Sequence, residues 1–130
     1  MTLTRTSRRG LLTVVIAACV LILFYVVRVL WLYAGATEGD VSASSSIPLP
    51  DGSQVVNVST DCASAGCWSI FDVRPPEDMT PKDLALQLGT DPQGKISGNL
   101  LDPRTIWLRA EQAGDLLSIH ADYWSSEWVP

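Results

Sequence analysis

Two cysteines with four residues between them, Cys62 and Cys67 in TDCASAGCWSIF, are the residues whose spacing most directly suggests chemistry. A structural zinc site normally takes four Cys or His ligands, and His120 is the only histidine of the chain. Redox pairs usually have the closer C-x-x-C spacing at the start of a helix. If the segments on both sides form a hairpin, the two cysteines lie opposite each other, within disulfide distance. We therefore expect a structural Cys62–Cys67 disulfide, with no metal and no cofactor.

The second candidate is the pair His120 and Asp122 in SIHAD. Residues two apart on a strand share a face, so the carboxylate can orient the imidazole as a general base. No nucleophile or oxyanion donor is recognisable beside them, and no serine lies in a G-x-S-x-G turn. We predict no catalytic residue and expect the chain not to be an enzyme. The alternative is an enzyme or redox module that uses His120 and Asp122, or the Cys62–Cys67 pair.

Four tryptophans follow residue 60, at Trp68, Trp107, Trp124 and Trp128. We expect most of them to lie in the hydrophobic core or to cover the sheet. Large aromatic side chains provide the buried apolar area that a short chain otherwise lacks. Trp124 and Trp128 stand among polar residues in the tail YWSSEWVP. This tail could fold back over the sheet, touch the bilayer interface or contact a partner, and we rank the three in that order. Trp124 and Trp128 are therefore the candidate contacts for a partner.

Residues 11–34, LLTVVIAACVLILFYVVRVLWLYA, predict a transmembrane helix with Arg28 as its only charge. At about 1.5 Å per residue this run is about 36 Å long, enough to cross a hydrocarbon core of about 30 Å. The long stem of Arg28 can carry its guanidinium to the lipid headgroups. Trp31 and Tyr33 follow it, as aromatic residues do at a membrane interface.

The flanks of this helix predict its orientation. Residues 1–10 contain Arg8 and Arg9, whereas no Lys or Arg lies between Arg28 and Arg74. The positive-inside rule then places residues 1–10 in the cytoplasm as a short leader and the C-terminal part outside. We expect the helix to be retained as a signal anchor. The main rival is cleavage after Ala36, because AGA at residues 34–36 fits an A-x-A site.

The part of the chain after the helix is strongly acidic. It has 5 basic and 14 acidic residues, a net charge of 5 − 14 = −9. Such a surface repels phosphate backbones, so we expect no nucleic-acid partner.

Composition divides this acidic part in two. Residues 35–50 are rich in small polar residues and end in prolines, which predicts a flexible linker. Residues 51–130 predict a small α+β domain, an antiparallel sheet with one helix. The alternation of apolar residues and the turn signals give the order strand, strand, helix, strand, strand at 54–61, 67–73, 80–89, 104–110 and 115–124. Thr80, Pro81 and Asp83 form the expected start of the helix.

These features together resemble the small anchored envelope proteins of Gram-positive bacteria. They predict a single-pass protein of the cell membrane, anchored in the bilayer through residues 11–34, with its N-terminus in the cytoplasm and its domain outside. We expect the domain to bind or scaffold another envelope component, most simply another envelope protein.

Overall fold

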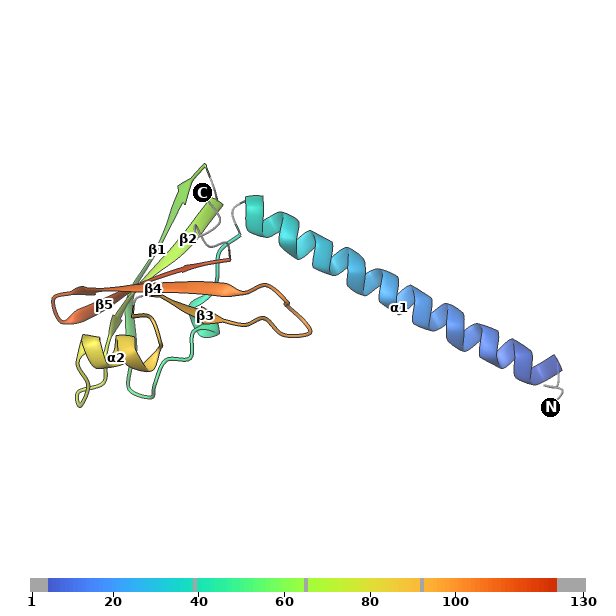
Figure 1. Cartoon of the computed structure of the whole chain (residues 1–130), viewed down its shortest axis with the longest axis horizontal. Helices are drawn as coiled ribbons and strands as arrows, with labels where there is room; N and C mark the ends of the chain where they lie inside the picture. Colours follow the sequence, from blue (N-terminus) through green and yellow to red (C-terminus); the bar gives the residue numbers. More distant parts are fainter. Residues whose placement is uncertain (1–4, 39, 65, 92, 124–130) are drawn as a thin grey trace.

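The structure is a computed structural model that describes residues 5–38, 40–64, 66–91 and 93–123. It consists of one long helix and a small domain at the C-terminal end of that helix (Figure 1). The two tail tryptophans predicted as partner contacts, Trp124 and Trp128, lie outside the described residues.

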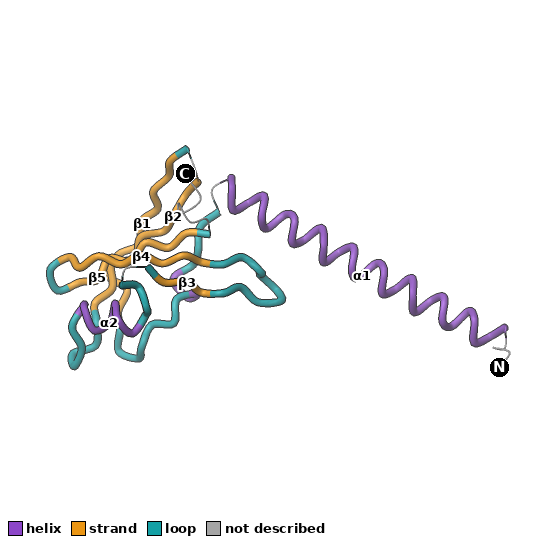
Figure 2. The backbone as a smooth tube through the Cα atoms, in the orientation of Figure 1, coloured by secondary structure: helices purple, strands orange, loops and turns teal. Residues whose placement is uncertain are grey.

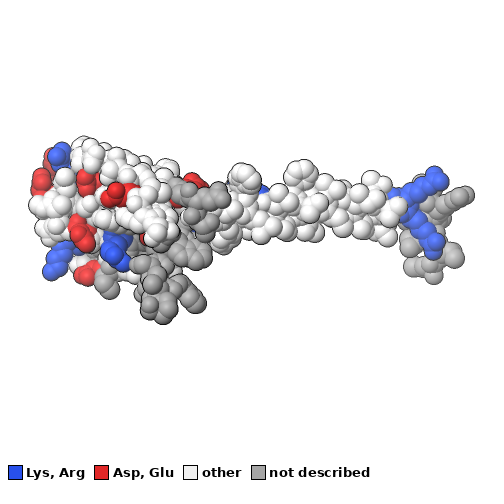
Figure 3. All heavy atoms as spheres, turned by 90° about the horizontal axis from the view of Figure 1, so that it is seen from above, with Lys and Arg blue, Asp and Glu red and all other residues white. Residues whose placement is uncertain are grey.

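The long helix, α1, spans Arg5–Glu38 and extends away from the domain (Figure 1). Its stretch Arg8–Ala36 is long and apolar enough to cross a membrane, by length and composition alone. Most of the apolar side chains along it are exposed, as Phe24 at 72% and Leu21 at 70% illustrate, whereas Ala36 at its end is buried. In Figure 3 this stretch is an almost uncharged rod, with basic residues at its far end and acidic residues on the domain.

The domain is built on a five-stranded antiparallel sheet in the order β1-β2-β5-β4-β3. The strands are β1 Gln54–Ala63, β2 Gly66–Arg74, β3 Gly94–Ile96, β4 Ile106–Ala113 and β5 Leu116–Asp122. The four predicted strands and the predicted helix all occur in the expected order. The short strand β3 was not predicted, because its three residues lie in a turn-rich passage without apolar alternation.

The predicted helix is α2, Pro81–Gln87, between β2 and β3 (Figure 2). Thr80 caps it by accepting a hydrogen bond from the Asp83 N–H, and the Asp83 carboxylate accepts from the Thr80 N–H. The hydroxyl of Thr80 also donates to this carboxylate and thereby lowers the pKa of Asp83. The capping box expected from the sequence is therefore confirmed.

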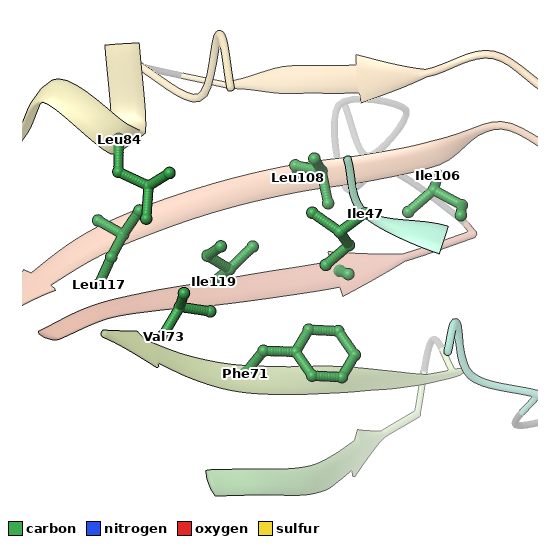
Figure 4. Packing of buried hydrophobic residues seen from close by; sticks show 9 residues of the cluster. Ile47, Phe71, Val73, Leu84, Ile106, Leu108, Leu117 and Ile119 are labelled. Atoms are coloured by element: carbon green, nitrogen blue, oxygen red, sulfur yellow. The ribbon is translucent and has the colours of Figure 1, made fainter. Parts of the chain in front are cut away.

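One face of the sheet carries the core (Figure 4). Alternate residues of β2, β4 and β5 point toward it, since successive side chains of a strand point to opposite faces. Leu84 from α2 and Ile47 from the segment before β1 pack over them. The buried cluster consists of Ile47, Phe71, Val73, Leu84, Ile106, Leu108, Leu117, Ile119 and Ala121.

The segment before β1 differs from the flexible coil that its composition predicts. It contains a short 3₁₀ helix, Ser44–Ser46, and buries Ser42 and Ile47 against the sheet. The Ser69 hydroxyl donates a 2.9 Å hydrogen bond to the Ser42 carbonyl. This segment is ordered because the sheet face needs more cover than α2 provides. The helix α2 has only seven residues, and Ile47 of this segment completes the buried cluster on that face.

Arg104, which is 6% exposed, joins the domain to α1. It donates two hydrogen bonds to Asp102, of 2.8 and 2.7 Å, one to the Asp40 carboxylate and one of 3.2 Å to the Leu32 carbonyl of α1. Its guanidinium also lies 3.9 Å from the ring centroid of Tyr123. The hydrogen bonds to Asp102 raise the pKa of Arg104 above its ordinary value, so the group stays charged. We call these five residues the Arg104 junction.

Candidate functional site

The Cys62–Cys67 disulfide predicted from the sequence is present. The two cysteines are direct partners in the β1–β2 register, and Ala63 pairs with Gly66 beyond them. Gly66 has a φ of +129°, a conformation that favours glycine. A Cβ on this residue would lie 3.7 Å from the Ala36 carbonyl oxygen, so the disulfide end of the hairpin lies beside the end of α1.

His120 and Asp122 line one hollow of about 280 Å³. They lie on the sheet face opposite the core, where they alternate along β5 with the buried Ile119 and Ala121. The other residues lining the hollow are Trp68, Gln93, Trp107, Leu108 and Arg109. We call this site the tryptophan hollow.

The pairing of the strands β2, β5 and β4 brings the residues of the tryptophan hollow together. Trp107 of β4 is opposite Asp122, and Arg109 is opposite His120. Trp68 of β2 lies two residues before Ile70, which is the partner of His120 on the other side of β5. Three neighbouring strands therefore bring aromatic, cationic, anionic and imidazole groups to one place.

The tryptophan hollow combines aromatic, charged and polar side chains. Its seven lining residues include no Ser, Thr, Cys or Lys, so they offer no common nucleophile other than His120 and Asp122 themselves. Among the described residues, no group of three or more His, Cys, Asp or Glu could hold a metal ion. Aromatic walls with a few polar groups are typical of ligand sites.

A second unusual surface is the strand β1 at the edge of the sheet. All ten of its residues are exposed, and among the described strands it pairs with β2 alone. Three of them are valines, with exposures of 37% for Val55, 43% for Val56 and 57% for Val58. The register shifts between Val55 and Asn57, which marks a bulge at Val56. Beyond this bulge, seven residues run unbroken to Ala63 with one charge, Asp61.

The predicted membrane-flanking residues occupy both ends of the apolar stretch of α1. Arg8 and Arg9 are exposed near its start. Trp31 at 79% exposure and Tyr33 at 45% lie in the turns nearest the domain. Arg28 contacts the domain, because its Nε and Nη2 donate hydrogen bonds of 3.2 and 3.0 Å to the Leu101 carbonyl.

Sequence reasoning missed the tryptophan hollow and the edge position of β1. The hollow had a usable signal: Trp107 and Arg109 alternate in one predicted strand, His120 and Asp122 in the next, and Gly114 lies in the turn between them. Pairing the two strands around that turn would have brought the four residues together. The edge position of β1 had no such signal. The local sequence of a strand does not determine which other strands pair with it.

The chain was compared with models of protein families, with curated proteins and with solved structures, and none of the three comparisons finds a match.

Proposed function

We propose that this chain is a single-pass membrane protein whose domain lies outside the cytoplasm and binds an extended segment of another envelope protein along β1. Its anchor is the apolar stretch Arg8–Ala36, which is long and apolar enough to cross a membrane and leaves most of its large apolar side chains exposed. The positive flank at Arg8 and Arg9 favours a cytoplasmic N-terminus. The disulfide supports an oxidising compartment for the domain.

The observation that carries the proposal is the open edge of β1. A strand paired on one side only presents a row of free N–H and C=O groups on the other, which is a template for an added strand. Natural edge strands are commonly shortened or protected by Lys, Pro or inward charges. Beyond its bulge β1 has seven residues, none of them Lys or Pro, with Val58 57% exposed.

The direction of β1 favours a different protein over a second copy. β1 ends at Ala63, beside the end of α1, and begins at the opposite end of the β1–β2 hairpin (Figure 1). Two identical edge strands pair symmetrically in the antiparallel sense. Such a pair would direct the two α1 helices to opposite ends of the joint sheet, where one membrane cannot hold both.

The test places a photo-crosslinking amino acid at Val58 or at Thr60 of the full-length chain in its native membranes. Both positions lie on one face of β1, two residues apart. We expect both to crosslink to one partner, with attachment points that mass spectrometry maps about two residues apart along an extended segment. The matched control is Leu86 on α2, which is 56% exposed, close to the 57% of Val58.

A charge on the strand provides the second arm of this test. Val58→Lys should reduce crosslinking from Thr60, whereas Leu86→Lys should not. Equal crosslinking from Leu86, or attachment points scattered over several proteins, would overturn the proposal. An adduct of two copies of this chain would show self-association instead.

A second candidate is an enzyme or redox module, and the tryptophan hollow supports only the form that uses His120 and Asp122. The specific observation in favour of this form is that His120 and Asp122 share the hollow with Arg109. The redox form would use the cysteine pair, which lies outside the hollow. For the redox form, mass spectrometry with and without a mild thiol reductant is decisive. A pair that exchanges readily supports redox work, and a pair that stays oxidised supports a structural disulfide.

A further inference from the structure

Two neighbouring leucines in the loop between β3 and β4 are the most exposed large apolar side chains of the described domain. Leu100 is 77% exposed and Leu101 is 72% exposed. In the core of the same domain, the side chains of Phe71, Leu108 and Leu117 are each only 1% exposed. Two adjacent exposed leucines form an apolar spot on the surface of the domain, a feature that raises the question of what covers it. We call residues 97–103 the leucine loop.

The leucine loop has a defined conformation. The Asn99 side-chain oxygen accepts hydrogen bonds of 2.8 Å from the Leu101 N–H and 3.0 Å from the Asp102 N–H. The Asn99 N–H donates to the Asp102 carbonyl at 2.8 Å. A Cβ on Gly98 would collide with the backbone of Pro103, so the two sides of the loop approach closely at its base. The leucines are therefore held outward by the fold of the loop.

Two successive turns of α1 hold this loop. Leu32 accepts from Arg104, directly after the loop, and Arg28 donates twice to the Leu101 carbonyl at the tip. Residues four apart lie on one face of a helix, so both contacts are made by the same face of α1. At about 1.5 Å per residue, Arg28 lies about 12 Å along α1 from Ala36, well inside the apolar stretch. Figure 1 shows the loop reaching from the sheet toward α1.

We infer that Leu100 and Leu101 insert into the lipid headgroup and upper acyl region of the leaflet next to the domain. This inference rests on the proposed membrane anchoring of α1. The loop tip is fixed at the level of Arg28, and Trp31 and Tyr33, which mark a membrane interface, lie in the adjoining turns of the same helix. A bilayer is the partner that must be present at that level if α1 spans it.

Arg28 supports the choice of lipid over a protein partner. A guanidinium at the edge of the hydrocarbon region needs hydrogen-bond acceptors. The Leu101 carbonyl supplies one on the domain side, and lipid headgroups supply the others. The loop thus lets one backbone carbonyl satisfy the arginine while the two neighbouring side chains enter the apolar layer.

The test measures depth in the full-length oxidised chain, reconstituted in phosphatidylcholine–phosphatidylglycerol vesicles. On a Cys19→Ala background, single cysteines at Leu101, Leu86 or Phe24 carry an environment-sensitive fluorophore. The Leu101 side chain is replaceable because only its backbone makes the loop contacts. Spin-labelled lipids with shallow or deep quenching groups then report the position of each fluorophore.

We expect the label at Leu101 to be blue-shifted and quenched mainly by the shallow spin label. The label at Phe24 should be quenched mainly by the deep one, and the label at Leu86 should remain water-exposed. Phe24 in the bilayer with Leu101 in water would overturn the leucine-loop inference and leave the anchor standing. Phe24 in water would overturn the anchor itself.

A third result is informative in a different way. A blue shift at Leu101 without quenching by any spin-labelled lipid would show that protein covers the loop, and it would also overturn the inference. The same measurement with the label at Leu100 repeats the test on the neighbouring side chain.

Discussion

Arg104 is one of the two arginines that connect α1 to the domain. It connects Leu32 of α1, Asp40 after α1, Asp102 of the leucine loop and Tyr123 after β5. These partners come from four separate parts of the chain. Because the guanidinium is only 6% exposed, each of its contacts contributes more to folding stability than an ion pair on the surface would.

We predict that Arg104→Ala destabilises the full-length chain by about 2 kcal/mol. The value is below the roughly 3–5 kcal/mol typical of breaking a fully buried pair, because Asp40 and Asp102 are partly exposed and water screens them. Urea unfolding in detergent, followed by tryptophan fluorescence, measures the change. The exposed Arg109→Ala is the matched control, with an expected change within about 0.5 kcal/mol. An equal loss in both variants would contradict the role given to the junction.

A pH dependence follows from Asp102. The hydrogen bonds from Arg104 lower the pKa of Asp102 below its ordinary value. A lowered folded-state pKa gives a stability contribution that is present above the unfolded-state pKa, about 3.9, and is lost as the pH falls through the folded-state value. The difference in unfolding free energy between the natural chain and Asp102→Asn should therefore be largest near neutral pH and shrink below about pH 4. A difference that stays constant between neutral pH and pH 3 would show that the pKa of Asp102 is the same in the folded and the unfolded chain, and it would contradict the effect given to Arg104.

At the scale of elements, the β1–β2 hairpin combines an open edge with a covalent closure. β1 contributes no residue to the buried core, so packing alone holds it weakly. Its backbone pairing with β2 and the Cys62–Cys67 disulfide are what keep it in place. A strand that is exposed on both faces and fixed at one end is well arranged to present its edge to a partner.

We predict that replacing both cysteines by serine costs about 2 kcal/mol, the chain-entropy value for so short a loop. The loss should fall mainly on β1. Hydrogen exchange should therefore speed up at the β1 amides that pair with β2 more than at β5, which lies inside the sheet. The natural chain treated with reductant serves as the chemical control. Uniformly faster exchange across the sheet would show instead that the disulfide supports the whole domain.

At the scale of the whole molecule, charge and apolarity are separated along the chain. Basic residues lie at the start of α1, an apolar rod follows, and all fourteen acidic residues come after it, from Glu38 onward (Figure 3). The Arg104 junction and the contact from Arg28 to Leu101 fix the domain against the last turns of the rod. This arrangement would hold the domain close to the membrane surface and limit the reach of β1 to partners near that surface.

We predict that a membrane-impermeant maleimide labels Leu86→Cys in intact cells, on a Cys19→Ala background. It should label Thr6→Cys only after the membrane is permeabilised, because the positive flank keeps the N-terminus inside. The mass of the purified chain identifies its N-terminus, so a chain beginning at residue 37 would show cleavage after Ala36. Labelling of Thr6→Cys in intact cells would reverse the proposed orientation.

The sequence by itself determined the elements and their chemistry. An apolar run predicts a long helix, alternation predicts four strands, and Thr80 with Asp83 predicts the start of α2, because each signal is local and recurs with the period of the element. The disulfide was predictable for the same reason, since Cys62 and Cys67 face each other across one turn.

Only the tertiary structure decided which elements are neighbours. The order β1-β2-β5-β4-β3 leaves β1 at an edge and puts Trp68 beside His120 and Asp122. It also brings Arg104 to Leu32 and Arg28 to Leu101, pairs separated by more than seventy residues. Contacts across such separations depend on how the layers cover one apolar sheet face, and no local pattern in the chain records that choice.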